Sequence, residues 1–107
     1  MNQTRIEVFE QMLTGDPANT MVLFGLAKEY EKAGDDGKLI ETLEKYLAAT
    51  EDEGNAYGML ARAWERTNQR EKARAAYQRG AEVATAHGHP GMAVEYKAIL
   101  ESEYSGS

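Results

Sequence analysis

Two pairs of basic side chains, each four residues apart, are the part of this sequence best suited to binding chemistry: Lys28 with Lys32, and Arg62 with Arg66. Like charges at that spacing destabilise an isolated helix by roughly a few tenths of a kcal/mol, so their repetition calls for a reason. A guanidinium group binds a carboxylate through two parallel hydrogen bonds, which predicts an acidic or carboxylate-bearing peptide as the ligand. The alternative is a solvated helix surface where the cations pair with neighbouring glutamates.

The histidines give much weaker evidence of a site. His87 and His89 flank one glycine in an expected loop with no third ligand signalled nearby, whereas zinc normally takes three or four protein ligands. The acidic pair Asp35-Asp36 is typical of a turn. No nucleophile motif, phosphate-binding glycine loop or H-E-x-x-H sequence is present. The sequence therefore predicts no metal, no cofactor and no enzymatic activity.

About six helices are expected to position these side chains. Apolar residues recur at helical spacing between turns rich in glycine, proline and acidic residues. The first break, Gly15-Asp16-Pro17, combines a residue suited to a helix end with one suited to the next helix start. The expected helices span residues 4–14, 18–33, 37–50, 54–67, 70–87 and 90–104.

One pattern occurs twice in the chain. When residues 23–47 are aligned with residues 57–81, seven apolar positions coincide, and the offset in numbering is constant (57 − 23 = 34). The matched pairs are Leu23 with Tyr57, Leu26 with Leu60, Ala27 with Ala61, Tyr30 with Trp64, Leu39 with Ala73, Leu43 with Tyr77, and Leu47 with Ala81. A fixed period between roughly 20 and 50 residues indicates a stacked repeat array.

This pattern resembles the tetratricopeptide repeat. The second copy reads Tyr57-x2-Leu60-Ala61-x2-Trp64, followed by Ala73-x3-Tyr77, while Leu39 in the first copy departs from the small residue preferred there. The resemblance implies an all-α solenoid of antiparallel helix pairs, forming a right-handed superhelix. It also implies a single domain, 1–107, with a half repeat at 1–19, repeats at 20–53 and 54–87, and a capping helix at 88–107.

In proteins of this family the concave face binds partners, and the first helix of each pair lines it. The resemblance implies five partner-binding residues: Phe24, Lys28, Lys32, Arg62 and Arg66. The same register places Glu31, Gly58 and Glu65 at exposed positions. Some family members hold chaperone C-termini in a carboxylate clamp of Lys, Asn and Arg. That specificity is not expected here, because the matching Asn is missing from the concave positions.

Composition narrows the function further. The net charge of −6 argues against general nucleic-acid binding, which relies on Lys and Arg to neutralise phosphates. The chain has no cysteine, which excludes a disulfide framework. No apolar run approaches the ~20 residues of a membrane span, and the first residues lack the continuous apolar stretch of a signal peptide. A cytoplasmic protein with a protein or peptide partner, and neither nucleic acid nor membrane, is the expectation.

Two functions remain open from sequence. The first is a non-catalytic interaction module that binds a peptide or protein segment on its concave face. The second is a self-associating structural module, because the first helix lacks its partner and the last has apolar residues to spare. A two-fold homodimer is the commonest such assembly, and Met92, Tyr96 and Ile99 are its expected contacts. The competing expectation is that Met92 and Tyr96 fold into the chain's own concave groove and block it.

Overall fold

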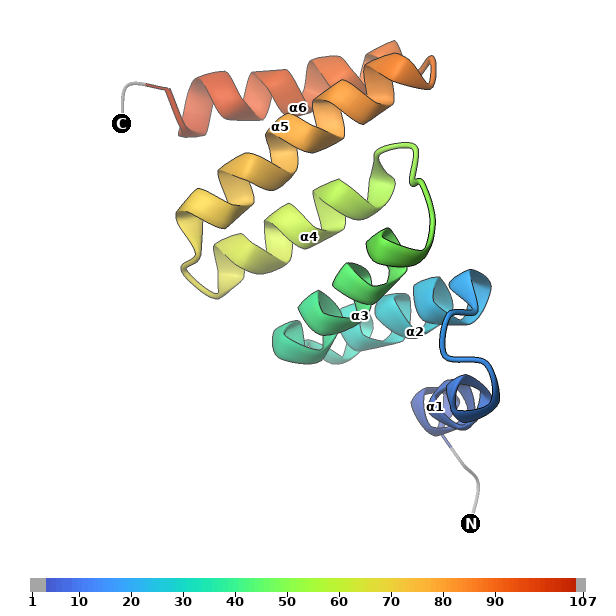
Figure 1. Cartoon of the computed structure of the whole chain (residues 1–107). Coiled ribbons are helices and arrows are strands. Elements are labelled where there is room, and N and C mark those ends of the chain that lie inside the picture. The colour runs from blue at the N-terminus through green and yellow to red at the C-terminus, as the bar shows by residue number, and fades with distance from the viewer. Residues whose placement is uncertain (1–3, 106–107) are drawn as a thin grey trace. The chain divides into compact units, whose positions relative to one another are not determined.

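The computed structural model describes residues 4–105, and the regular elements in that range are six α-helices (Figure 1). They are α1 Arg5–Gly15, α2 Thr20–Ala33, α3 Asp36–Ala49, α4 Asn55–Arg66, α5 Arg70–Ala86 and α6 Pro90–Glu103. The all-α prediction is confirmed, and the expected helix ends differ from these by two positions at most. None of these helices combines the length and the apolar character that crossing a membrane requires.

The chain forms two compact units, which meet in the sequence between Glu51 and Asp52. The first unit holds α1, α2 and α3, and the second holds α4, α5 and α6. The finer division into half repeats, repeats and a capping helix within one domain stays a prediction.

Polar side chains fix where the first three helices begin. Thr4 and Glu7 form a capping box at α1, each side chain accepting the other's backbone N–H at 3.1 Å. Asn19 and Asp35 cap α2 and α3, each accepting a backbone N–H three residues ahead. The turn predicted at Gly34 ends α2, with φ of 75°, a conformation that glycine adopts without strain.

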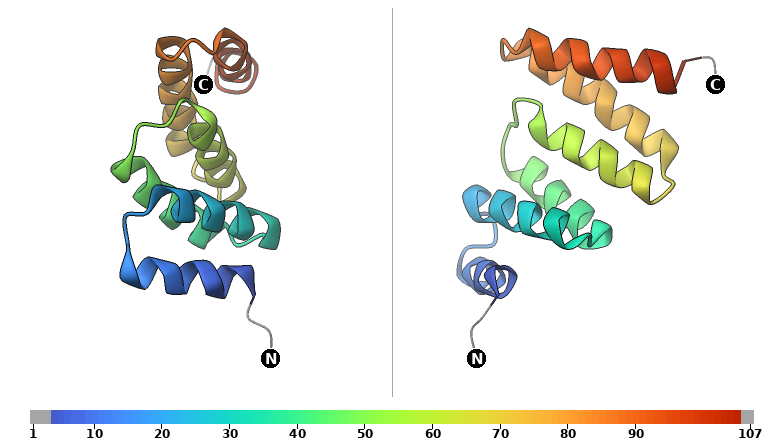
Figure 2. Two further views of the ribbon diagram at one scale, coloured as in Figure 1. Left: turned by 90° about the vertical axis from the view of Figure 1, so that its right-hand side faces the viewer. Right: turned by 180° about the vertical axis from the view of Figure 1, so that it is seen from behind.

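In the first unit α2 packs against both α1 and α3 (Figure 2). Seven buried side chains of α2 and α3 are Leu23, Leu26, Ala27, Tyr30, Leu39, Ile40 and Leu43. α1 is joined to them by the Tyr30 hydroxyl, which donates to Glu10 at 2.5 Å, and by the Phe9 ring, which lies against Gly25. Helix-periodic apolar residues therefore form this core, as the repeat pattern predicts.

In the second unit α5 packs against both α4 and α6, and α5 and α6 are close at their connecting turn and spread apart away from it (Figures 1 and 2). The buried cluster consists of Ala61, Ala73, Ala76, Tyr77, Ala81, Tyr96 and Tyr104. Trp64, Met92, Ile99 and Leu100 pack around it and are partly buried. Ala61 and Ala73 have no exposed surface, because the small side chains let α4 and α5 approach closely.

Candidate protein-binding surfaces

The first candidate surface lies on α2 and α3. Met21, Phe24 and Lys28 follow at intervals of three and four residues, so they share one face of α2. The Phe24 ring packs against Tyr46 of α3, with ring centroids 5.1 Å apart and planes inclined at 40°. A hollow of about 330 Å³ is lined by Thr20, Met21 and these two rings. Met21 has 84% of its surface exposed, which leaves a large apolar group at the rim in contact with solvent.

The two predicted binding lysines of α2, Lys28 and Lys32, have different neighbours. The Lys28 nitrogen lies 5.3 Å from the centre of the Phe24 ring, an attractive arrangement because the ring face is electron-rich. Lys32 instead pairs with Glu29 at 3.6 Å, and the same carboxylate accepts Arg5 at 3.2 Å. Lys28 therefore places a positive charge at the aromatic wall of the hollow, while the charge of Lys32 is partly compensated within the unit.

The sequence pattern does not mark Met21 or Tyr46 as binding residues. Tyr46 belongs to the second helix of its pair, whereas the family resemblance directs attention to the first helix. One signal was available: Tyr46 aligns with Gly80 (46 + 34 = 80), so the first copy has an aromatic side chain where the second has none. That ring packs on Phe24, which is half-buried rather than exposed for this reason.

The second candidate surface lies on α4, where Arg62 and Arg66 are both exposed. The prediction that Gly58 is exposed on this face is wrong. Gly58 is buried, and the Tyr96 ring and hydroxyl fill the space that a side chain there would need. The covering residue comes from α6, two helices further along the chain, so the local pattern around Gly58 gave no sign of it.

Glu65 is exposed, as the sequence predicts, and its carboxylate also joins elements of the second unit. Its carboxylate accepts hydrogen bonds from Tyr77 at 3.1 Å and from Tyr104 at 2.7 Å. Burial, followed by this hydrogen bond, raises the pKa of Tyr104 to about 12. Burial and the charge of Glu65 also raise the pKa of Tyr77, against the effect of nearby Arg62. Glu65 thus links α4 to α5 and to the residue that follows α6.

The three residues expected to make homodimer contacts lie within the second unit. Tyr96 is 4% exposed, its ring lies 5.8 Å from that of Tyr77, and its hydroxyl donates to the Gly54 carbonyl at 2.9 Å. Met92 and Ile99 are partly buried against the same cluster. Met92 and Tyr96 therefore pack onto helices of their own unit, while the blocking of a concave groove by them stays a prediction. Val94 is the large apolar residue of α6 that is well exposed, at 65%.

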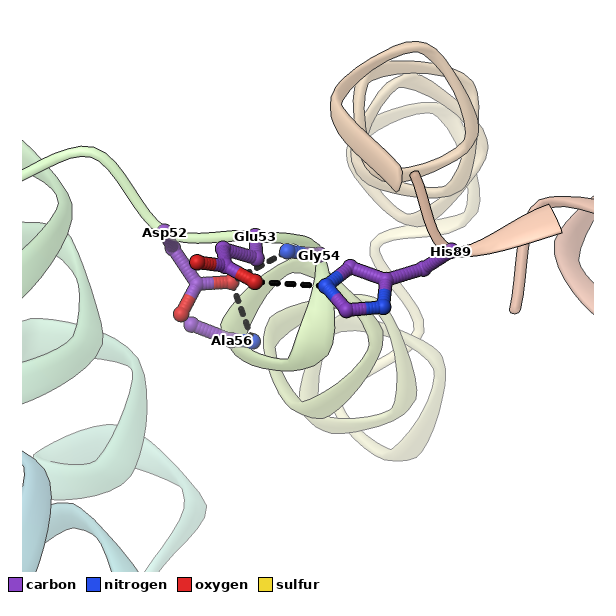
Figure 3. Close-up of polar contacts among 5 residues, drawn as sticks. All are labelled: Asp52, Glu53, Gly54, Ala56 and His89. Atoms are coloured by element: carbon purple, nitrogen blue, oxygen red, sulfur yellow. Dashed lines mark hydrogen bonds and ion pairs between the residues drawn. The ribbon is translucent and has the colours of Figure 1, made fainter. Parts of the chain in front are cut away.

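The connection before α4 is held by two acidic residues (Figure 3). Asp52 is buried and accepts the backbone N–H groups of Gly54 and Ala56 at 2.8 and 2.9 Å, which satisfies two free donors at the start of α4. Glu53 contacts His89 at 2.5 Å, and both side chains are well exposed. Among residues 4–105 no group of three or more His, Cys, Asp and Glu side chains is arranged to hold a metal ion. His89 is an ion-pair partner of Glu53 here.

This ion pair predicts a shift in the titration of Glu53. The hydrogen bond and charge of His89 lower the pKa of Glu53 below its ordinary value of 4.5. A carboxyl whose pKa is lowered by folding adds stability above its unfolded pKa, and this is lost as the pH falls through the folded value. We expect His89→Ala to raise the Glu53 midpoint toward 4.5, measured by NMR. Glu7, whose pKa is lowered by Thr4, is the control that should not move.

Helix pairs packed in this way define the class of fold: an all-α solenoid of tetratricopeptide-like type. Two crystal structures of MamA are similar to this chain at 24% sequence identity. One matches with a TM-score of 0.68 over 91% of this chain, the other with 0.69 over 94%. This chain spans 65% and 63% of those two MamA chains. No family model and no curated protein matches the sequence.

Proposed function

We propose that this chain is a non-catalytic protein-interaction module, and that the hollow on α2 and α3 is its principal site for a peptide segment. The observation that carries the proposal is the group around that hollow: exposed Met21 and Lys28 beside the half-buried rings of Phe24 and Tyr46. Aromatic side chains bordering a pocket are typical of the residues that dominate protein–protein binding energy. An exposed methionine adapts to differently shaped apolar partners.

The composition of the hollow favours a particular ligand chemistry. An apolar side chain of the partner would fill the space between Met21 and the two rings, where it buries apolar surface on both sides. Lys28, beside Phe24, would then pair with an acidic side chain or a terminal carboxylate of the same segment. The ligand that fits is therefore an apolar residue next to Asp, Glu or a chain end.

The exposed face of α4 is proposed as a second binding surface, argued from its own residues. Arg62 is exposed on α4, close enough to Tyr77 and Tyr96 to oppose the rise in their pKa values. Its guanidinium would bind a carboxylate bidentately, with exposed Arg66 one turn further along. The acidity of the partner, the cytoplasmic location and the lack of enzymatic activity remain predictions.

Selection from a displayed library of random peptides would test the principal site. We expect peptides retained by the wild-type chain to be enriched in an apolar residue within about two positions of Asp, Glu or the C-terminus, because those groups match the hollow and Lys28. Lys28→Glu should weaken the selected peptides at least about tenfold, since it opposes like charges. Met21→Asp should weaken them similarly by placing a charge at the apolar rim.

Lys38→Glu is the matched control. It makes the same change of charge on the same unit, but about 12 Å along α3 from Tyr46, and should leave binding within about twofold. Peptides without the expected pattern, or peptides bound equally by wild type, Lys28→Glu and Met21→Asp, would show that the hollow is not the site.

A further inference from the structure

The first and last helices occupy opposite halves of the repeating helix pair. With the period of 34, Phe9 of α1 aligns with Leu43 of α3 and Tyr77 of α5 (9 + 34 = 43, 43 + 34 = 77). The packing follows this register: Phe9 lies against Gly25 of the next helix, and Tyr77 lies against Tyr96 of the next helix. α1 is therefore a second helix of a pair, and α6, which follows α5, is a first helix.

On α1, the face that a first helix would cover is open. Val8 aligns with Thr42 and Ala76, which are both buried, whereas Val8 is 39% exposed. Met12 aligns with Tyr46, which is half-buried, and with Gly80, which is buried (12 + 34 = 46, 46 + 34 = 80), whereas Met12 is 50% exposed. No residue of α1 is buried.

The position of Gly80 shows what covers this face in a complete pair. A Cβ on Gly80 would lie 3.0 Å from the Cβ of Tyr57, which belongs to α4, the first helix of the same pair, and 3.0 Å from the Tyr96 ring of α6. The exposed side of α1 therefore includes the side that turns toward the first helix of the same pair.

On α6, the face that a second helix would cover is open as well. One period further along the chain, the positions equivalent to Tyr57, Leu60, Ala61 and Trp64 are Gly91, Val94, Glu95 and Ala98. In α4, Leu60 is 8% exposed and Ala61 is fully buried. In α6 all four equivalents are exposed, and Val94 is 65% exposed.

These two open faces complement each other in size. Where Tyr57 meets Gly80 in the complete pair, α6 has Gly91 and α1 has Met12, so the large and the small residue exchange places. The other large residue of α4, Trp64, is replaced by Ala98 on α6, which leaves room for a longer side chain opposite.

The two faces also complement each other in charge. Ala61 and Ala73 share one buried cluster in the complete pair. Their equivalents are Glu95 on α6 and Arg5 on α1 (61 + 34 = 95, 73 − 68 = 5), which carry opposite charges. The Arg5 side chain is 71% exposed and already pairs with Glu29, so it is placed to take a second carboxylate as a neighbour.

We propose that α6 of one copy and α1 of a second copy form a composite helix pair of the α4–α5 type, so that copies associate head to tail. The contact is heterologous, because each copy contributes a different surface, in contrast to a two-fold dimer. On α6 this contact uses Val94, Glu95 and Ala98. The homodimer contacts expected from the sequence were Met92, Tyr96 and Ile99. It is independent of the peptide site on α2 and α3.

Light scattering on the full chain across a concentration series, with two single variants and their mixture, tests this arrangement. Met12→Asp blocks the α1 face and Val94→Asp blocks the α6 face, and both change exposed side chains. We expect the wild-type mass to rise with concentration to at least about twice that of one chain, because a heterologous contact leaves one surface open at each end. Each variant alone should stay at the mass of one chain.

An equal mixture of the two variants should regain a complex of about two chains, since each variant keeps the one surface that the other lacks. Circular dichroism of each variant checks that the fold is kept. Met21→Asp, a charge at the exposed methionine of α2, is the control that should associate like wild type. A wild-type chain that stays monomeric throughout, self-association that survives Met12→Asp, or a mixture that stays monomeric would overturn the proposal.

Charge reversal tests the register itself. Arg5→Glu and Glu95→Arg should each weaken association at least about tenfold, because each places like charges opposite one another. The double variant in one chain should restore it, since the pair is then reversed but still complementary. A double variant as weak as either single variant would exclude the pairing of Arg5 with Glu95.

Discussion

Tyr77→Ala is expected to lower the free energy of unfolding by about 3–5 kcal/mol, the usual cost of removing a large buried aromatic side chain. Tyr77 is 2% exposed and is in ring contact with Tyr96 and Tyr104. Its loss therefore leaves a cavity between α4, α5 and α6. Because folded domains retain only about 5–15 kcal/mol in total, this change alone should unfold a substantial part of the second unit.

Urea denaturation followed by the fluorescence of Trp64 measures this effect. Trp64 is the one tryptophan of the chain and packs against the cluster that contains Tyr77, so its signal reports on the second unit. Tyr77→Phe separates packing from hydrogen bonding: it keeps the ring and removes only the bond to Glu65, at a cost of about 1–2 kcal/mol. If alanine cost no more than phenylalanine, the cluster would not be the main source of stability in this unit.

Sequence periodicity predicted the six helices because helix formation and core packing here depend on the spacing of apolar residues along the chain. Leu26 and Leu60 are buried at matching positions, and Gly34 ends α2 where a turn is expected. The repeat reports which face of each helix is apolar, and that face determines which residues are enclosed. The same spacing still identifies the open faces of α1 and α6.

The binding surfaces were predicted less completely, because they depend on which distant residue covers which helix face. Tyr46 adds an aromatic wall beside Phe24 from another helix, and two tyrosines hold Glu65 in place. Each of these contacts joins side chains of different elements, and no local pattern specifies them. The exposed lysines and arginines, in contrast, follow from helical register alone.

Gly58→Ala is the second change for which we expect a large effect, and its direction depends on Tyr96. In the interior of a helix, alanine is more favourable than glycine by about 1 kcal/mol, so the substitution would stabilise α4 if nothing opposed it. Here the new Cβ would overlap the Tyr96 hydroxyl and lie 2.9 Å from the ring carbon that carries it. Overpacking of this kind costs about 1–3 kcal/mol.

Tyr96 has little freedom to yield. Only 4% of the residue is exposed, and moving its ring would break the hydrogen bond to the Gly54 carbonyl. Gly80 confines the other side of the ring, where a Cβ would lie 3.0 Å from it. We therefore expect the overpacking cost to outweigh the helix preference, so that Gly58→Ala lowers the unfolding free energy by up to about 2 kcal/mol in urea denaturation.

In a Tyr96→Ala chain, the same substitution should raise the unfolding free energy instead of lowering it. With the ring and hydroxyl gone, the new Cβ no longer overlaps them, and the helix preference of alanine then stabilises α4 by up to about 1 kcal/mol. Gly91→Ala, at a helical glycine with open space around it, is the control that should be neutral or stabilising in both backgrounds. If Gly58→Ala still lowered the unfolding free energy without Tyr96, the backbone of α4 would be the cause. A double-mutant cycle separates the two explanations, because it isolates the interaction between positions 58 and 96.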